Sequence, residues 1–361
     1  MEKLKVGVIG CGAMGASHFD AYGRMLDLVE VTALCDIKDE ALESAAARWP
    51  DARTEKDFRK LLKPGDLDLV SVVTMPRTHC EISMAALESG ANVLCEKPFS
   101  MNINEADQML NRAKESGKLI QVGTNMRHML EAGILKDLVE SGRLGKPSYI
   151  RAWTYYTDLP WWGPHHIKEI SAGGALASTA IHIADLALWV AGSPDPISVS
   201  GSTHQLFPKK RSSSAPSAEA HDSYNVEDIA VAHIRLSDGG TFILEGTWAH
   251  ERVASHYSFE IICEKGTISF DPLLVLMDEG GQIVDRTPVD YAETAQRHSW
   301  GDSVYRELLR FASAIRDGTP PAQTPREIRN LQLIQDSIYE SAARGCEVRL
   351  DKIIDNSLVG E

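Results

Sequence analysis

The first 123 residues alternate short apolar runs with stretches of helical periodicity. Runs such as LKVGVIG, VEVTALCD and ANVLCE have the length and residue types of buried strands. Between them, DEALESAAARW and NEADQMLNRAKESG space their apolar residues along one helix face. Strands and helices that take turns are typical of a doubly wound parallel sheet. The pattern therefore predicts an α/β domain over residues 1–123.

The remaining residues, 124–361, show a different pattern. Helices are expected over about 128–142 and 173–191, and two more near 302–317 and 325–343 close the chain. Longer runs of β character lie among them, joined by hairpin turns such as SDGG and EKGT. Long adjacent strands with hairpins predict an α+β domain with a large, mostly antiparallel, open-faced sheet.

The composition favours a soluble globular protein, with 43% hydrophobic and 24% charged residues. No run approaches the roughly 18 apolar residues of a membrane span, and the first residues enter a strand without a signal-peptide pattern. A formal charge of −14 disfavours nucleic acid or an anionic membrane as partner. The six scattered cysteines lack metal-ligand spacing. We expect a cytoplasmic protein with reduced thiols and no metal.

A glycine-rich turn follows the first predicted strand. In VGVIGCGAMG, Gly10, Gly12 and Gly15 form G-x-G-x-x-G, and a helix is expected to begin near Ala13. The glycines serve a tight turn, a close backbone approach to a pyrophosphate, and close packing of helix on strand. Within a strand–turn–helix–strand unit, this arrangement predicts a dinucleotide site.

The second predicted strand ends at Asp36, where an acidic side chain can accept hydrogen bonds from ribose hydroxyls. A carboxylate repels the 2′-phosphate of NADP, so the sequence favours NAD. Lys38 follows two residues later and leaves NADP possible.

The run LCEKPFS places Glu96, Lys97 and Pro98 at the carboxyl end of a predicted parallel strand. Open α/β sheets bind ligands at that edge. A lysine there can have its pKa lowered by burial and exchange a proton with a substrate hydroxyl. The alternative is a surface lysine that only caps the strand.

The segment GGALASTAIHIAD, residues 173–185, carries polar side chains at helical spacing. In a regular helix, Ser178, His182 and Asp185 share one stripe. The stripe holds a general acid/base and a carboxylate, so it is either part of an active site or the packed face of an ordinary helix.

Aromatic side chains are concentrated in RAWTYYTDLPWWGPHH, residues 151–166. Their faces suit the C–H side of a sugar or an aglycone, although they could equally fill a core. Adjacent histidines rarely point the same way, so a substrate or surface role is favoured over a metal for His165 and His166. The aromatic residues of the segment are Trp153, Tyr155, Tyr156, Trp161 and Trp162.

Together these motifs resemble the Gfo/Idh/MocA oxidoreductases, which include glucose–fructose oxidoreductase and inositol dehydrogenases. GCGAMG, Asp36, TMPRTH (74–79), EKP (96–98) and the 173–185 segment follow in the family's order and spacing. The C-terminal tail is similar as well, so the resemblance covers nearly the whole chain. It implies an N-terminal Rossmann domain that binds NAD(P) and a C-terminal substrate and oligomerisation domain.

The resemblance also implies roles for individual residues. Lys97 would be the catalytic lysine near the nicotinamide, and His182 would touch the reacting oxygen and relay its proton, with Asp185 behind it. The expected cofactor-binding residues are Gly10, Gly12, Ala13, Met14, Gly15, Asp36, Thr74, Met75, Pro76, His79, Glu96, Lys97 and Asn125. The expected substrate-binding residues are Lys97, Arg127, Tyr155, Trp161, His165, Ser178, Thr179 and His182, with Arg127 an anchor for either substrate or structure.

The sequence departs from the family at Ser178, where an aspartate is common. A serine offers only a neutral hydrogen bond. The lysine and histidine could suffice, with Ser178 or Thr179 holding a water or a sugar hydroxyl. A carboxylate such as Asp158 or Glu169 could enter the site instead. The third reading is a catalytically dead site.

These features predict an NAD(P)-dependent dehydrogenase that oxidises a ring secondary hydroxyl of a sugar, an inositol-like polyol or a glycoside to the ketone. The alternatives are a redox-assisted glycoside-processing enzyme with tightly bound NAD and a non-catalytic nucleotide-binding sensor. We also expect a homo-oligomer, dimer or tetramer, through the open sheet face, with Phe242, Leu244 and Trp248 supplying apolar surface.

Overall fold

The chain divides into two compact units that are described separately below. Residues Met1–His128 and His298–Arg329 form the first, and Met129–Arg297 and Asn330–Glu361 form the second. The sequence assigned all residues after 123 to one second domain, whereas residues 298–329 belong to the first unit. The computed structural model describes residues 2–159, 161, 163–207, 216–250, 254–288 and 300–350.

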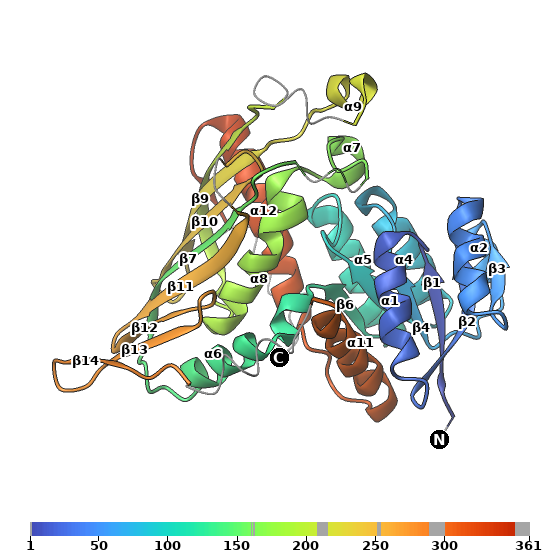
Figure 1. Cartoon of the computed structure of the whole chain (residues 1–361), viewed down its shortest axis with the longest axis horizontal. Helices are drawn as coiled ribbons and strands as arrows, with labels where there is room; N and C mark the ends of the chain where they lie inside the picture. The colour runs from blue at the N-terminus through green and yellow to red at the C-terminus, as the bar shows by residue number, and fades with distance from the viewer. Residues whose placement is uncertain are drawn as a thin grey trace. The chain divides into compact units, whose positions relative to one another are not determined.

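The first unit is built on a six-stranded parallel sheet with the order β3-β2-β1-β4-β5-β6 (Figure 1). This confirms the predicted doubly wound sheet. The strand order reverses between β1 and β4, and ligands of such sheets bind at the carboxyl ends near that point. The strands are β1 (Leu4–Ile9), β2 (Val29–Cys35), β3 (Arg53–Glu55), β4 (Leu69–Val72), β5 (Asn92–Glu96) and β6 (Ile120–Gly123).

Two buried apolar clusters form the core of this unit. One includes Val304, Leu308 and Phe311 of α11, which packs against α1 although almost 280 residues separate them. The helices are α1 (Ala13–Gly23), α2 (Asp39–Arg48), α3 (Phe58–Leu62), η1 (Pro76–Thr78), α4 (His79–Glu88), α5 (Ile103–Ser116), η2 (Asn125–His128) and α11 (Trp300–Asp317).

The second unit contains a nine-stranded sheet with the order β14-β13-β12-β11-β7-β10-β9-β8-β15. Its pairs are antiparallel except for β7 and β10, which run parallel. The predicted mostly antiparallel sheet is therefore confirmed. The strands are β7 (Pro147–Tyr155), β8 (Pro196–His204), β9 (Ile229–Leu236), β10 (Thr241–Thr247), β11 (His256–Cys263), β12 (Gly266–Ser269), β13 (Leu274–Asp278), β14 (Ile283–Asp285) and β15 (Val348–Arg349).

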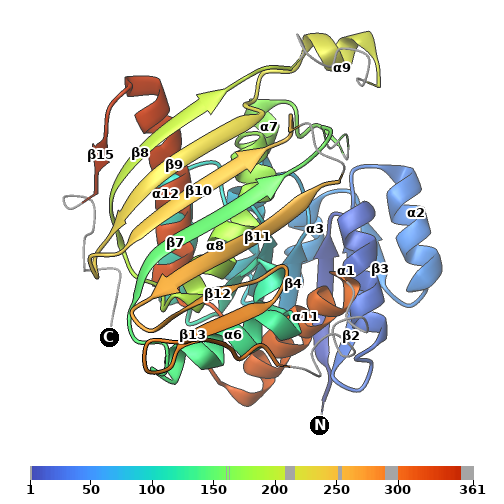
Figure 2. The same ribbon diagram turned by 60° about the vertical axis from the view of Figure 1, so that its left-hand side comes forward.

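Helices cover one face of this sheet. Figure 2 shows α8 and α12 together behind the strands, and α8 packs directly against β7 and β11. Helix α12 starts among residues of the first unit and continues into the second. The helices are α6 (Leu130–Glu140), α7 (Lys168–Ser171), η3 (Leu176–Ala180), α8 (Ile181–Val190), α9 (Ala218–Asp222) and α12 (Pro325–Arg344).

Strand β10 shows which side chains face the helices. Phe242 and Leu244 are fully buried, and a Cβ on Gly246, which has the same parity, would lie 2.8 Å from Cβ of Ala180 in η3. Trp248 is buried as well, with its Nε1 donating to Thr179. The expectation that Phe242, Leu244 and Trp248 supply an exposed apolar face was wrong, because they belong to the covered side.

The stretch Lys168–Val190 is long and apolar enough to cross a membrane by composition alone. In this fold, 94% of its most apolar window is buried inside the protein. It includes η3 and α8, which pack on the sheet, so it has the character of a core helix.

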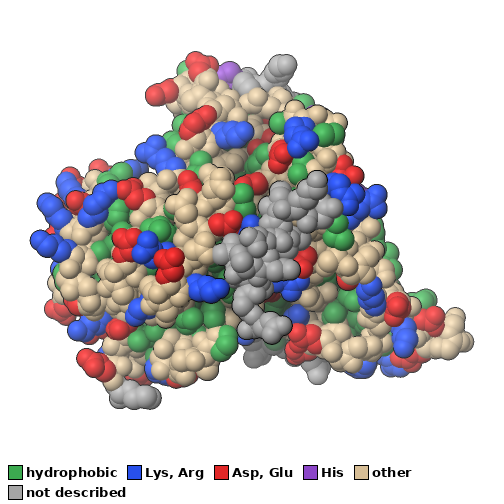
Figure 3. Space-filling view, turned by 180° about the vertical axis from the view of Figure 1, so that it is seen from behind, with side chains coloured by type: hydrophobic (Ala, Val, Ile, Leu, Met, Phe, Trp, Pro, Cys, Tyr) green, Lys and Arg blue, Asp and Glu red, His purple; other side chains and the backbone are tan. Residues whose placement is uncertain are grey.

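The side chains on the surface in Figure 3 are of mixed charge. Lys and Arg side chains are interspersed with Asp and Glu over this face, without a continuous basic surface among the atoms described there.

Candidate functional site

The three glycines of the first turn differ in what a side chain at each position would meet. Gly10 has φ +102°, and a Cβ there would lie 2.2 Å from the carbonyl oxygen of Val73. A Cβ on Gly15 would lie 2.4 Å from the Gly10 carbonyl oxygen. Around Gly12, by contrast, a Cβ would meet nothing within 4 Å. The first and third positions are fixed by packing, and the second leaves open backbone at the start of α1, as a pyrophosphate requires.

Asp36 lies just after β2, beside the glycine turn. Its Oδ2 accepts from the Cys11 N–H at 2.7 Å, and its Oδ1 accepts from the Lys38 N–H at 2.8 Å. Each carboxylate oxygen keeps further acceptor capacity for a hydroxyl. Ala13 and Met14 form the first turn of α1 in front of it. The residues present fit an adenosine ribose and a pyrophosphate.

His79 connects two loops of the first unit. Its Nδ1 lies 2.9 Å from the Pro98 carbonyl oxygen and its Nε2 lies 3.0 Å from that of Thr74. The ring is fully buried, and this burial lowers the pKa of His79. Met75 and Pro76 begin the short η1 turn between these contacts. The imidazole therefore ties the 74–79 loop to the turn after β5, and a contact of its ring with the cofactor stays a prediction.

Lys97 follows directly after the last residue of β5. Burial lowers its pKa, and the neighbouring Glu96 opposes this by favouring the charged amine. Glu96 is buried; its Oε2 accepts from the Lys97 N–H at 3.3 Å, and its Oε1 lies 3.0 Å from Nε2 of His18. The backbone N–H of Lys97 thus bonds a buried carboxylate whose charge also acts on the lysine amine, which favours a role in the site over that of a simple surface cap. Sequence reasoning missed His18, although its place three residues after the last motif glycine is a usable signal.

The segment that carries Ser178 is not a regular helix. Residues Leu176–Ala180 form a π-helical turn, and a regular helix follows from Ile181 to Val190. A π turn contains an extra residue and is frequently found at functional sites. Ser178, His182 and Asp185 are 1%, 8% and 2% exposed. The prediction of one regular helix over this segment was wrong at Leu176–Ala180. Because the π turn changes the spacing, Ser178 does not share a regular helical stripe with His182 and Asp185.

Ser178 lies next to a histidine. Its Oγ is 3.2 Å from Nδ1 of His165. The acidic side chains considered from the sequence make other contacts and are exposed: Asp158 accepts from the Leu159 N–H, and Glu169 accepts from Asn225. These contacts do not join either carboxylate to Ser178, and the alternative that a carboxylate enters the site stays open. The group in contact with Ser178 is thus the imidazole of His165.

Glu227 holds the start of the same segment. Its buried carboxylate accepts from the N–H groups of Gly174 and Leu176 and from the Tyr339 hydroxyl, at 2.9–3.0 Å. A Cβ on Gly174 would lie 1.9 Å from the Glu227 carbonyl oxygen, and one on Gly173 would lie 1.9 Å from the Tyr339 hydroxyl oxygen. The glycine pair therefore lets this segment pack directly against Glu227 and Tyr339, a contact that the sequence pattern did not reveal.

Tyr155 lies on the sheet face opposite to α8. Its hydroxyl donates to Glu245 Oε2 at 2.6 Å, and Glu245 accepts from Arg151 at 2.8 Å. Side chains alternate along a strand, and the neighbouring Thr154 is the buried one. Tyr155 therefore lies on the face of β7 opposite to Thr154, and its substrate contact stays a prediction.

Trp161 is part of an aromatic cluster. Its ring lies 5.6 Å from that of Phe207, edge to face, and 5.2 Å from that of His166. The cluster also contains Trp248, whose Nε1 donates to Thr179 Oγ1 at 3.0 Å. The alternative of a packed interior is favoured for Trp161. Trp162 lies outside the described residues.

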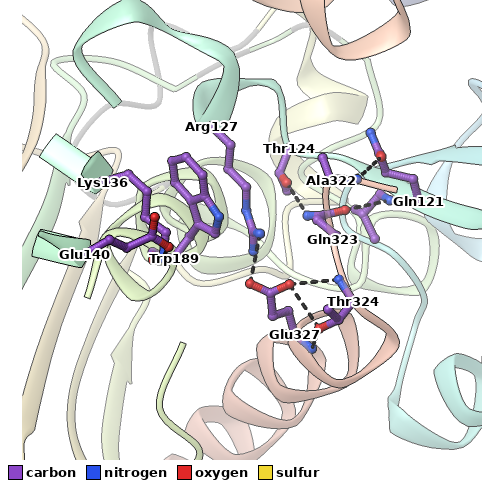
Figure 4. Close-up of polar contacts among 11 residues, drawn as sticks. Gln121, Thr124, Arg127, Lys136, Glu140, Trp189, Ala322, Gln323, Thr324 and Glu327 are labelled. Atoms are coloured by element: carbon purple, nitrogen blue, oxygen red, sulfur yellow. Dashed lines mark hydrogen bonds and ion pairs between the residues drawn. The ribbon is translucent and has the colours of Figure 1, made fainter. Parts of the chain in front are cut away.

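Arg127 and Asn125 are engaged within the first unit. The Arg127 guanidinium lies 3.1 Å from Glu327 Oε1, as Figure 4 shows, and both groups are shielded from solvent. Asn125 Nδ2 donates to Ser303 Oγ at 2.7 Å. Both residues thereby connect η2 to the C-terminal segment. The ion pair with Glu327 supports a structural role for Arg127. Its contact with substrate stays a prediction.

Two parts of the chain match the models of one protein family. Residues 4–124 match the model of an oxidoreductase family with an NAD-binding Rossmann fold, the Gfo/Idh/MocA family. Residues 134–269 match the C-terminal domain of the same family. The chain belongs to the Gfo/Idh/MocA oxidoreductase family. Its first unit is the NAD-binding Rossmann domain of that family, which confirms the sequence prediction.

Characterised members of the Gfo/Idh/MocA family are similar to this chain over their whole length. D-Glucoside 3-dehydrogenase of Escherichia coli strain K12 is 26% identical, with 96% of this chain and 97% of the relative covered. Myo-inositol 2-dehydrogenase of Thermotoga maritima is 25% identical, covering 97% and 100%. The oxidoreductase domain protein from Kribbella flavida has a TM-score of 0.85 at 25% identity, covering 97% of this chain and 99% of its own. Levoglucosan dehydrogenase in complex with NADH and levoglucosan shares the fold, with a TM-score of 0.85 at 24% identity over 96% and 99% of the two chains.

Proposed function

We propose that this protein is an NAD-dependent dehydrogenase that oxidises a ring secondary hydroxyl of a sugar, an inositol-like polyol or a glycoside to the ketone. The observation that carries the proposal is Lys97, which follows the buried Glu96 at the carboxyl end of β5 in an NAD-binding fold and whose amine has its pKa lowered by burial. The relatives named above act on a glucoside, an inositol and levoglucosan. NAD, when bound by the glycine turn and Asp36, would supply the hydride acceptor.

In the proposed mechanism, the neutral Lys97 amine accepts the proton of the reacting hydroxyl. Burial lowers the pKa of Lys97 and so favours the neutral amine, and the Glu96 carboxylate stabilises the ammonium once the proton arrives. His182 holds the hydroxyl oxygen by a hydrogen bond and carries the proton onward. Ser178 and Thr179 orient the sugar through neutral hydrogen bonds.

The test is a substrate panel. Sugars, inositols and glycosides are incubated with NAD or NADP, and reduced cofactor is followed by its absorbance. Turnover with NAD is expected. The absence of turnover with either cofactor over the whole panel contradicts the proposal. NAD that copurifies with the protein, without net release of NADH, indicates redox-assisted glycoside processing instead. Binding of NAD without any turnover, by both the unmodified protein and Lys97→Ala, indicates a non-catalytic sensor.

The Asp36→Asn variant tests the choice of cofactor. The substitution removes the charge that repels a 2′-phosphate and weakens the hydrogen bonds to the ribose. Hydrogen bonds to charged groups contribute about 1.5–3 kcal/mol, so the KM for NAD should rise about 10-fold or more while activity with NADP increases. Steady-state kinetics with both cofactors measure this. An unchanged NAD to NADP ratio would show that Asp36 does not select the cofactor.

The Ser178→Ala variant tests whether the lysine and histidine suffice. Ser178 contributes one neutral hydrogen bond, worth about 0.5–1.5 kcal/mol, so kcat/KM should fall by no more than about 10-fold. The kinetics are measured on the best substrate of the panel, with Ser202→Ala on the exposed part of β8 as the matched control. A loss of about 1000-fold would show that Ser178 replaces the family aspartate in the chemistry itself.

A further inference from the structure

A chain of buried hydrogen bonds leads to the carboxylate beside Lys97. Tyr22 and His18 of α1, Ser71 of β4 and Glu96 of β5 belong to the first unit and are all buried. The Tyr22 and Ser71 hydroxyl oxygens are 2.6 Å apart. Ser71 Oγ lies 3.3 Å from His18 Nδ1, and His18 Nε2 lies 3.0 Å from Glu96 Oε1. The side chains of Tyr22, Ser71 and His18 thus form a chain of hydrogen bonds that ends at the Glu96 carboxylate.

The donors and acceptors along this chain fit one consistent arrangement. Tyr22 donates to Ser71, the Ser71 hydroxyl donates to His18 Nδ1, and the His18 Nε2–H donates to the ionised Glu96. His18 lowers the pKa of Glu96 against the effect of burial. The second oxygen of Glu96 accepts from the Lys97 N–H.

The backbone leaves the Glu96 carboxylate little room to turn. A Cβ on Gly123 of β6 would lie 2.8 Å from Oε1 and 2.9 Å from the carboxyl carbon. The carboxylate is therefore packed against the β6 backbone on one side and bonded to His18 on the other. A buried side chain that is confined in this way keeps one rotamer.

We propose that His18, supported by Ser71, is a positioning residue that holds Glu96 ionised beside Lys97 and so fixes the charge that faces the Lys97 amine. The Glu96 carboxylate lies against the Lys97 backbone N–H and its charge favours the protonated Lys97 amine; only the importance of this effect for catalysis rests on the proposed function. Without the His18 donor, a buried carboxylate takes up a proton. Lys97 would then lose its opposite charge, and its amine would lose protons at lower pH.

Other titratable groups border this chain on neighbouring elements. Glu307 of α11 acts on Tyr22, and Glu96 itself acts on His79 of α4 and Cys95 of β5. Burial lowers the pKa of His79 and raises the pKa values of Tyr22 and Cys95, so these three stay uncharged around neutral pH. The Glu96 charge is therefore the one expected to respond to removal of His18.

The experiment follows the titration of the Lys97 amine by NMR in the full-length protein labelled with 13C at the lysine ε-carbon. The signal of Lys97 is assigned by its absence in Lys97→Met. In His18→Leu, the midpoint should fall by about one pH unit or more, the usual size of the effect of a neighbouring opposite charge. His18→Gln retains an N–H donor near the Nε2 position and should restore most of the shift. The acidic limb of the pH profile of kcat/KM should move in the same direction.

The controls separate this effect from a general loss of stability. Leu110→Ala removes a buried side chain of α5 in the same unit and should leave the Lys97 midpoint unchanged. Ser71→Ala is the milder variant if His18→Leu does not fold, and it should give a smaller shift of the same sign. An unchanged midpoint in a folded His18→Leu or Ser71→Ala protein overturns the proposal. Because the titration needs no substrate, it can be read even if the panel shows no turnover, so the two proposals fail separately.

Discussion

Replacing Lys97 with methionine is expected to lower kcat by about 1000-fold, since a positioned acid/base contributes about 10²–10⁴-fold. Methionine has a similar length and keeps the apolar stem, but it cannot accept a proton. The Kd for NAD should change by less than about threefold, because the glycine turn and Asp36 remain intact. Steady-state kinetics and calorimetric titration with NAD measure the two effects separately.

The pH dependence sharpens this prediction. Burial lowers the pKa of Lys97, and only the neutral amine accepts the hydroxyl proton. Oxidation by the unmodified protein should therefore increase as the pH rises through the Lys97 pKa and decrease below it. The residual activity of Lys97→Met should not show this increase with pH. Lys114→Met, on the exposed surface of α5, is the matched control and should retain full activity. A Lys97→Met protein that keeps more than about a tenth of kcat would show that another group takes the proton.

The sequence predicted the architecture well, because local periodicity determines it. The alternation of apolar runs and helical stretches over residues 1–123 corresponds to the six-stranded parallel sheet. The hairpin turns predicted the antiparallel pairs of the second sheet. The packing of α11 on α1 was not predictable, since it depends on contacts between residues almost 280 positions apart.

Strand patterns also leave open which face is covered. Alternation shows that Phe242 and Leu244 share a face, but the helices that cover it are distant in sequence. The same uncertainty applies to Tyr155, which bonds Glu245 on the opposite face. The open face of β7 and β10 carries this polar pair, with Arg151 beside it. A homo-oligomer through that face stays a prediction, and it would have to accommodate these charges.

In the candidate site too, local motifs could be predicted from the sequence and contacts between distant residues could not. Motif spacing located the glycine turn, Lys97 and the 173–185 segment. The carboxylates and imidazoles that support them come from far along the chain, as with His18 and Glu96, 78 residues apart, or Glu227 and Gly174, 53 residues apart. Ser178 and His165 are separated by 13 residues across a loop and a π turn. No periodicity encodes such pairs.

His182→Ala is expected to lower kcat by about 100-fold, near the lower end of what general acid/base groups contribute. The effect should be smaller than that of the lysine, since His182 assists proton transfer while Lys97 accepts the proton. Thermal stability should change little because α8 keeps its apolar contacts with the sheet. The kinetics are compared with those of His204→Ala, which removes an exposed histidine at the end of β8. If His182→Ala raises KM with kcat unchanged, the residue binds the substrate without handling the proton, and the missing aspartate at Ser178 then marks a site that relies on Lys97 alone.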